Sequence, residues 1–511
     1  MRIRSSIINI SFAMVGQILG LLISFIARIV FIQELGTEYL GLNGLFVNIL
    51  SILSLVELGI GPAITFSLYK PLAENDTEKV KSLMKLYKKA YICIGILILI
   101  MGISFTPFIE VFIKTLPNIP HIHLIFLLFV INAAISYFYS YKRSLIISNQ
   151  KQYIATIYRY SFFILLNIIQ IIVLYLTHNF ILFLVCQIIA TFAENIVVSK
   201  KADKLYPYLQ EKNVQKVDKL TISQITRNIR ALTSHKLGGV VVTSTDSLII
   251  SKFVGLVGVG LYSNYQLIIN ALNIVTSQIF SSITASVGNL GVTETDEKKI
   301  SIFNIVFFMN FWIYSFISIC LVVLLNPFIK LWIGEDFVIN TSIVLVIILN
   351  FFLTGMRKGV LTFRDALGIY WYDRHKPIFE CIINLVVSLI LVKQLGMLGV
   401  FIGTTISTLA TSFWVEPYVL YKYGFKSSVV PFFRKYALYT IVTIIVCLIT
   451  LYGVNNFRDV TIVNFIIQAF ICIVIPNGIF VILFHKTDEF RYLYNLINKL
   501  IFKLLKRKNV L

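Results

Sequence analysis

Six ionisable residues lie within or at the ends of long apolar stretches of this 511-residue chain. A charge inside a lipid bilayer is costly, so such a residue normally faces a protein interior or water and marks a binding or coupling site. The basic members are candidates for binding an anionic cargo: Arg28, Arg357 and Arg364. The acidic members are candidates for coupling or gating: Glu57, Asp246 and Glu380.

Arg357 and Arg364 are seven residues apart, which places them on one face of a helix. Guanidinium groups bind phosphate oxygens in pairs, so this basic stripe suits a cavity that accepts a diphosphate. The alternative is an internal network of arginines and carboxylates, because Asp365, Asp373 and Glu380 lie close in the sequence.

Glu57 lies in the segment "SLVELGIGPAITF", about ten residues from the cytoplasmic end of its predicted span. Gly59 and Gly61 allow helices to approach closely, and Pro62 can bend a span. The pattern therefore predicts a carboxylate beside a hinge. A structural polar contact near a kink is the alternative to a direct role in cargo or proton coupling.

The composition indicates the elements that hold these residues. The chain is 58% hydrophobic and only 14% charged, with a mean hydropathy of +0.85. Runs of about 20 apolar residues recur throughout, which predicts an all-α, polytopic membrane protein. Fourteen spans are expected, at 7–33, 42–69, 90–113, 122–147, 153–176, 179–199, 237–253, 260–289, 301–329, 338–363, 377–393, 397–421, 436–453 and 461–484.

The net charge of +21 is explained by where the basic residues lie. With fourteen spans, 36 of the 45 Lys and Arg residues fall on the side that holds both termini, and five fall on the other side. The positive-inside rule then makes both termini cytoplasmic, and the surplus charge favours anionic lipid over nucleic acid as a partner. The first span is not followed by a cleavage site, so no removable signal peptide is expected.

The remaining motifs indicate no enzyme. The six cysteines lie in predicted spans without the spacing of a metal site or a disulfide framework, and His121 and His123 lack further ligands nearby. No cofactor or metal is expected. A polysaccharide polymerase or membrane glycosyltransferase is the alternative from another class, and it should have a large outward loop or a nucleotide-sugar domain.

An offset of 219 residues aligns the chain with itself without gaps. Nine residues in the window find identical counterparts, among them Gly36, Gly41 and Thr65. Both copies begin on the cytoplasmic side, so the repeats are parallel six-helix bundles related by a pseudo-twofold axis along the membrane normal. The expected domains are 1–202, a linker at 203–236, a second bundle at 237–424, two extra spans at 425–484 and a basic amphipathic tail at 485–511.

At the same offset, Asp246 falls on Ala27, next to Arg28. This register predicts a salt bridge between Arg28 and Asp246 that opens and closes across the pseudo-twofold axis. The alternative is that Arg28 extends to the outer membrane surface by itself.

Three segments carry a family resemblance: "ELGIGPAITFSLYKPLAENDTEKVKSLMKLYKK", "FRDALGIYWYDRHKP" and "GTTISTLATSFWVEPYVLYKYGF". They resemble the polysaccharide-repeat-unit transporters, which are flippases of lipid-linked oligosaccharides in the multidrug/oligosaccharidyl-lipid/polysaccharide exporter superfamily. The resemblance covers residues 1 to about 435. It implies two six-span bundles around a central cavity, alternating access, and a polyprenyl-diphosphate-linked sugar repeat unit as cargo.

The expected function is therefore transfer of a lipid-linked oligosaccharide across the bacterial plasma membrane for capsule, exopolysaccharide or O-antigen assembly. Membrane lipids, a polysaccharide polymerase and glycosyltransferases are the expected partners. A lipid II flippase and a multidrug antiporter of the same superfamily are the alternatives. A multidrug antiporter should have an acidic cavity for cationic cargo.

Overall fold

The structure is a computed structural model that describes residues 2–57, 59–211, 214–369 and 371–508. Side chains are described over these ranges except at 2–11, 13, 227–228, 230–239, 241–243, 285–286, 288–293, 497 and 500–508. The described residues form helices and connecting segments without a strand. The predicted all-α membrane fold is confirmed.

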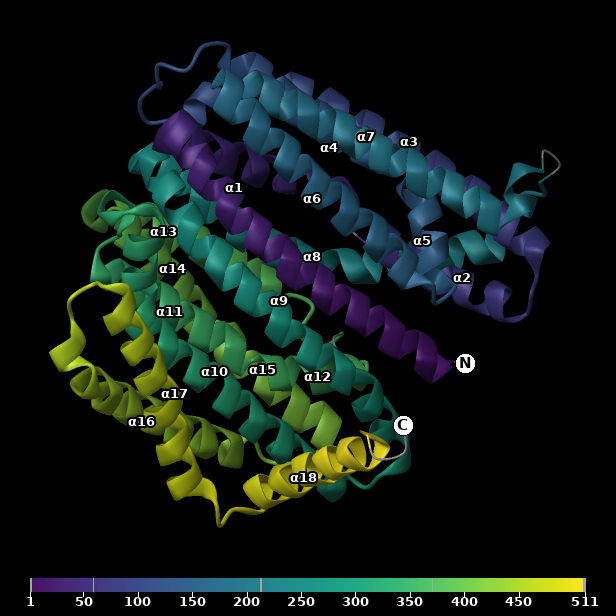
Figure 1. Ribbon diagram of the computed structural model, residues 1–511. Coiled ribbons are helices and arrows are strands. Elements are labelled where there is room, and N and C mark those ends of the chain that lie inside the picture. Colours follow the sequence, from purple (N-terminus) through teal and green to yellow (C-terminus); the bar gives the residue numbers. More distant parts are fainter. Residues whose placement is uncertain (1, 58, 212–213, 370, 509–511) are drawn as a thin grey trace. The chain divides into compact units, whose positions relative to one another are not determined.

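The chain divides into two compact units, Met1–Ser263 and Asn264–Leu511. In the first unit, α3, α4 and α7 run side by side (Figure 1). Its helices are α1 (Arg2–Leu53), η1 (Ser54–Glu57), α2 (Ile60–Ala73), α3 (Thr77–Phe105), η2 (Thr106–Phe112), α4 (Ile122–Phe138), α5 (Ser140–Ser148), α6 (Gln152–Thr177), α7 (Phe180–Leu205), η3 (Pro207–Gln210), α8 (Lys219–Phe253) and the start of α9 (Leu256–Thr293).

The second unit is built around α10, which packs against α11, α16, α17 and α18. The pair α16 and α17 comprises the two extra C-terminal spans that the sequence predicts. The helices are α10 (Asp296–Ile333), η4 (Glu335–Phe337), α11 (Thr341–Met356), α12 (Lys358–Ala366), α13 (Lys376–Leu395), α14 (Met397–Ala410), α15 (Ser412–Val419), η5 (Leu420–Phe425), α16 (Val430–Gly453), η6 (Asn455–Phe457), α17 (Ile462–Phe484) and α18 (Asp488–Lys508).

Eleven helices of the described residues are long and apolar enough to cross a membrane, and the bent pair α4 and α5 makes up to twelve. One of the eleven, Met14–Glu57, includes most of the first predicted span and the first half of the second, with a kink between them. The predicted span 237–253 belongs to α8, and its side chains are described at residue 240 and at residues 244–253. Fourteen spans are thus compatible with the structure, although the exact number is not established by it.

Glycine sets the two breaks in the first half of the first unit. Gly36 has φ 83° and ψ 179°, and it kinks α1 between the first two predicted spans. The second span is itself interrupted, because α1 ends at Leu53 and Gly59 takes the left-handed conformation, φ 81°. Pro62 lies in the first turn of α2, where its missing N–H breaks no helical hydrogen bond. The break in the helix therefore lies at Gly59, and not at Pro62.

The segment predicted as a linker, 203–236, becomes helical at Lys219. Asp218 caps α8: its carboxylate accepts hydrogen bonds from the Thr221 backbone N–H and from the Thr221 hydroxyl, both at 2.7 Å. These bonds hold the pKa of Asp218 below its usual value. An ionised cap therefore fixes where α8 begins.

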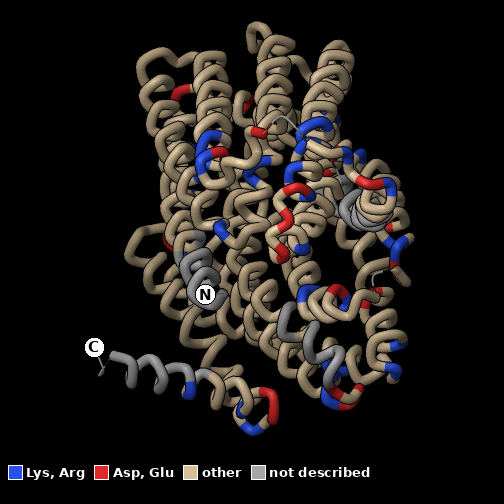
Figure 2. The backbone as a smooth tube through the Cα atoms, turned by 90° about the vertical axis from the view of Figure 1, so that its right-hand side faces the viewer, with Lys and Arg blue, Asp and Glu red and all other residues tan. Residues whose placement is uncertain are grey.

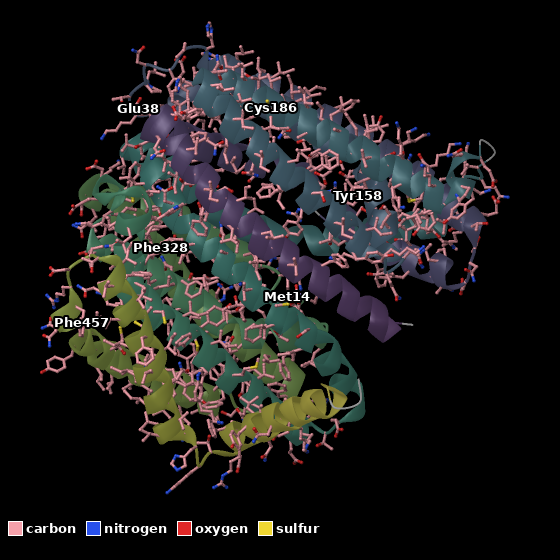
Figure 3. The ribbon with its side chains drawn as sticks, viewed as in Figure 1. Met14, Glu38, Tyr158, Cys186, Phe328 and Phe457 are labelled. Atoms are coloured by element: carbon pink, nitrogen blue, oxygen red, sulfur yellow. The ribbon has the colours of Figure 1, made fainter. Side chains whose placement is uncertain are left out.

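Large apolar side chains cover the outside of the spans. On α1, the residues Met14, Ile18, Leu22 and Ile26 follow one another at intervals of four, and each is 54–57% exposed. Figure 3 shows Met14 and Glu38 at well-separated points along α1, with the apolar stretch between them. Figure 2 shows long uncharged stretches of the tube between groups of charged residues. Such exposed apolar surface is expected for helices that face lipid.

The internal repeat is visible as a reciprocal contact inside the first unit. A Cβ atom on Gly41 would lie 1.9 Å from the Leu256 carbonyl oxygen, and one on Gly260 would lie 2.6 Å from the Thr37 carbonyl oxygen. The offset of 219 residues relates Gly41 to Gly260 and Thr37 to Leu256. Gly41 therefore approaches Leu256, and its counterpart Gly260 approaches Thr37, which is the counterpart of Leu256. A pseudo-twofold axis requires such a reciprocal pair of contacts.

Candidate functional site

A network of charged side chains lies within the second unit, where α12, α13 and α15 meet. Its cations are Arg357, at the junction of α11 and α12, Arg364 on α12, and Lys376 at the start of α13. Its carboxylates are Glu416, Glu380, Asp365 and Asp373. We call these seven residues the second-unit charge network.

Glu416, on α15, is the centre of this network and is fully buried. Arg357 donates to both of its carboxylate oxygens, from Nε at 2.9 Å and from Nη2 at 2.7 Å. Lys376 Nζ donates to the same carboxylate and, at 2.9 Å, to Ser412 Oγ. Arg364 Nη1 lies 3.9 Å from Glu416 Oε1. One buried carboxylate is thus shared by three cations, which offsets the cost of burying it.

Arg364 also binds two aspartates. Its Nη1 donates to Asp373 at 2.6 Å, and its Nε and Nη2 donate to Asp365 Oδ1 at 3.0 and 2.8 Å. The Arg364 side chain is nearly buried, and that of Asp373 is fully buried. The donors of this guanidinium are therefore directed at protein carboxylates.

Glu380 links the remaining two cations. It lies 3.6 Å from Arg357 Nη1 and 3.4 Å from Lys376 Nζ. With Glu380 included, the second-unit charge network has three cations and four carboxylates. The arginine–carboxylate network that the sequence offers as an alternative is therefore present, and cargo binding by Arg357 and Arg364 stays a prediction.

Glu416 is the site residue that the sequence-based selection omits. It lies in "FWVEPYV", a carboxylate in an apolar run directly before a proline, much as Glu57 precedes "LGIGP". The rule that selects Glu57, a carboxylate within a predicted span, selects Glu416 as well. Its partners Arg357 and Arg364 are more than 50 residues away, so their pairing needed the structure.

The first unit contains a similar arrangement on α5 and α7. Arg143 donates to Glu194, and Lys142 Nζ donates to Asp203 at 2.7 Å and to Ser199 Oγ at 2.8 Å. The bent pair α4 and α5, with an angle of 44°, corresponds in chain order to α11 and α12. In each unit, the second half of an interrupted span thus supplies cations to carboxylates on a later helix.

Glu57 lies at the end of η1, two residues before the left-handed Gly59. Its carboxylate interacts with the hydroxyls of Tyr91 on α3 and Tyr137 on α4. A Cβ atom on Gly61 would lie 3.3 Å from the Tyr91 hydroxyl and 3.4 Å from Glu57 Oε1. The break in the second span is therefore tied to two neighbouring helices through one carboxylate, and a coupling role for Glu57 stays a prediction.

Arg28 and Asp246 both belong to the first unit. Arg28 is half-buried, and its Nη1 donates to Ser263 Oγ at 3.0 Å. Asp246 is buried and lies beside Tyr262, the neighbour of Ser263 in the chain. The two predicted partners thus have neighbouring contacts on α9, and the predicted salt bridge between them stays a prediction.

Lys358 directly follows Arg357 but takes no part in the second-unit charge network. Its Nζ donates to Ser277 Oγ at 3.4 Å, and its side chain is half-buried. In the described part of the chain, neither Lys358 nor Arg28 forms an ion pair with a carboxylate. Their charges are therefore available to an anion. Among the described residues, no group of three or more His, Cys, Asp or Glu side chains is placed to hold a metal ion.

The sequence profile of a family described as "Polysaccharide biosynthesis protein" matches residues 6–287, more than half of the chain. No curated protein matches by sequence. Three solved structures have a similar fold. The inward-facing form of a multidrug resistance MATE family transporter of the MOP superfamily has a TM-score of 0.66 and 16% identity, over 81% of this chain and 97% of that chain.

The lipid II flippase MurJ, in an inward closed conformation, has a TM-score of 0.66 and 14% identity, over 93% of this chain and 98% of that chain. A MOP superfamily transporter from Pyrococcus furiosus, described as having a binding pocket of reverse polarity, has a TM-score of 0.52 and 16% identity, over 84% and 96%. The helical spans and the family match agree: the chain belongs to the polysaccharide biosynthesis protein family, and its multi-pass helical fold is similar to that of MOP superfamily transporters.

Proposed function

We propose that this transporter moves a polyprenyl-diphosphate-linked oligosaccharide from the cytoplasmic to the outer leaflet of a bacterial inner membrane. The observation that carries the proposal is one half-buried cation in the spans of each unit, Arg28 in the first and Lys358 in the second, whose hydrogen bonds go to hydroxyl groups and not to carboxylates. A hydroxyl leaves the positive charge in place. A diphosphate can therefore displace it and gain a charge-assisted bond.

In the first unit, Arg28 would bind diphosphate oxygens through its planar fork. In the second unit, Lys358 would attract the anionic cargo as a point charge. Arg357 and Arg364 would contact the cargo only by exchanging bonds with Glu416, Asp365 or Asp373. In an alternating-access cycle, Glu57, Asp246 and Glu380 would act in coupling or gating, because each is a carboxylate in or next to a span with polar neighbours.

A second candidate function is antiport of cationic drugs. The surplus carboxylate of the second-unit charge network favours it, because a cationic cargo needs negative charge. A lipid II flippase differs from the main proposal only in its cargo. The positive-inside pattern supports cytoplasmic termini, and a polymerase and glycosyltransferases would act on the same cargo outside and inside the membrane.

Deletion of the gene followed by analysis of lipid-linked intermediates tests the proposal. Complete repeat units should accumulate on the cytoplasmic leaflet. The wild-type gene should restore export, whereas Arg28→Gln or Lys358→Gln should restore it poorly. The matched control is Arg458→Gln, an exposed arginine in the connection before α17. Missing sugars would indicate a transferase, and a normal lipid-linked pool with raised sensitivity to cationic drugs would favour the antiporter.

A further inference from the structure

A pocket of 340 Å³ lies in the first unit among α3, α5, α7 and the segment that follows α7. Four lysines line it: Lys81, Lys85, Lys88 and Lys142. It has no residue in common with the second-unit charge network or with the cations of the proposed cargo site. We call it the α3 pocket.

Two of the four lysines are neutralised within the protein. Lys81, whose side chain is 3% exposed, pairs with Glu78 and with Glu211, and Lys142 pairs with Asp203 at 2.7 Å. These bonds fix the walls of the pocket. They also attach Glu211, which follows η3, to the first turns of α3.

The other two lysines keep their charge available. Lys85 and Lys88 are exposed, and neither forms an ion pair within the described ranges of the chain. Because residues at intervals of three or four share a face of a helix, Lys81, Lys85 and Lys88 form one row along α3. Among the described residues of the lining, four lysines outnumber two carboxylates, Asp203 and Glu211, so this part of the pocket is net positive.

We propose that the α3 pocket binds the phosphate group of an anionic ligand. Its volume lies at the lower end of the range of small-ligand pockets and suits a phosphate-bearing headgroup. The pocket lies at the end of α3 that the basic-residue pattern places on the cytoplasmic side, where basic pockets between membrane helices bind anionic lipid headgroups. A soluble phosphate compound has the same chemistry.

Binding there has a consequence for the segment between α7 and α8. Leu209, Gln210 and Glu211 form part of the lining, so a phosphate held by Lys85 and Lys88 bridges α3 to this segment. The ligand thus strengthens an attachment that the Lys81–Glu211 ion pair already makes. The attachment of the segment between α7 and α8 to α3 therefore depends on how much anionic lipid or phosphate surrounds the protein.

The test uses the full-length protein in detergent with two probes, phosphatidylglycerol and inorganic pyrophosphate. The variant Lys85→Gln/Lys88→Gln is compared with Lys89→Gln/Lys200→Gln, which removes the same charge from two exposed lysines outside the pocket. Native mass spectrometry should show at least about threefold less bound phosphatidylglycerol in the pocket variant only. Phosphatidylcholine, with no net charge, should bind both variants equally.

Hydrogen exchange gives a second readout. Phosphatidylglycerol should slow exchange of the amides from Leu209 to Glu211 in the wild type and in the control variant, but not in the pocket variant. If only pyrophosphate binding depends on Lys85 and Lys88, the ligand is a soluble phosphate. Equal binding of both probes by the two variants, with unchanged exchange, would overturn the proposal.

Discussion

Glu416 and Glu57 are carboxylates in apolar spans, but their surroundings differ. Glu416 is fully buried and accepts hydrogen bonds from Arg357 and Lys376, whereas Glu57 contacts tyrosine hydroxyls. Ion pairs with buried arginine and lysine suit a permanent structural centre, and hydrogen bonds from uncharged tyrosine hydroxyls suit a group that changes partners. At the scale of the residue, Glu57 is therefore the better candidate for coupling, and Glu416 the better candidate for holding the second unit together.

The first prediction separates structure from transport at Arg357. Arg357→Gln and Glu416→Gln should each destabilise the protein by about 3–5 kcal/mol, because each leaves a buried charge without its main partner. The double variant should be more stable than the sum of the two losses predicts. Thermal unfolding in detergent measures stability, and surface polymer in a deletion strain measures transport.

The control is Lys330→Gln with Glu335→Gln, an ion pair of the same unit whose Glu335 side chain is 76% exposed. The two single variants and the double variant of this exposed pair should each change the free energy of unfolding by no more than about 1 kcal/mol. If the double variant at Arg357 and Glu416 regains stability but not export, Arg357 contacts the cargo. Additive losses in stability would contradict a direct pair.

At the scale of the element, the apolar pattern predicts where helices lie but not where they break. Hydropathy is averaged over about 20 residues, so it joins the end of α1, η1 and α2 into one span, 42–69, that the backbone interrupts at Gly59, whereas the kink at Gly36 falls between two predicted spans. The sequence places a bend near Glu57, where the structure has a break, but assigns it to Pro62, and a hinge motion there stays a prediction. Proline in the first turn of a helix is tolerated, and the left-handed conformation at Gly59 makes the break.

The second prediction concerns this break. Gly59→Ala should lower stability by about 1–2 kcal/mol, because an L side chain is strained in the left-handed conformation. It should also reduce transport if the break changes shape during the cycle. Gly478→Ala is the control: Gly478 lies within α17, and an added Cβ atom meets no heavy atom within 4 Å. That variant should be as stable as the wild type or more so, since alanine favours helix. Equal behaviour of the two variants would rule out strain at Gly59.

At the scale of the whole molecule, composition and the 219-residue offset predict the helical membrane fold and its repeat. They do not predict the compact division at Ser263, which assigns α8 to the first unit, because packing between distant segments decides it. The candidate site shows the same limit. Arg357, Arg364 and Glu380 are recognisable as charges in or next to spans, but their common partner Glu416 is identified only by the fold.

The third prediction tests the repeat. Gly41→Ala and Gly260→Ala should each cost about 1–3 kcal/mol, because the new Cβ atom meets a backbone carbonyl oxygen on the other segment. The double variant should lose less stability than the two single variants together, because moving the two segments apart once relieves both clashes. Thermal unfolding measures all three, with Gly478→Ala again as the control. A loss at only one of the two glycines would contradict the reciprocal contact.

The fourth prediction is topological. Reporter tags inserted between α7 and α8 and at the C-terminus should both be cytoplasmic, because 36 of the 45 basic residues then lie inside. Accessibility to a membrane-impermeant thiol reagent, after a single cysteine is placed at each point, measures this directly. A cysteine in place of Arg458 should react from outside. Labelling of either predicted inner position in intact cells would overturn the orientation.

The reciprocal approach of Gly41 and Gly260 also bears on the origin of the chain. A contact in which each side presents the same patch is the kind that two identical subunits make in a symmetric homodimer. Residues Thr37 to Gly41 and their counterparts Leu256 to Gly260 make such a contact inside one polypeptide. The contact between the two repeats therefore has the geometry by which two copies of a half-length chain would pair with each other. Glycine occupies the same position on both sides of it, although the residues between Thr37 and Gly41 differ from those between Leu256 and Gly260.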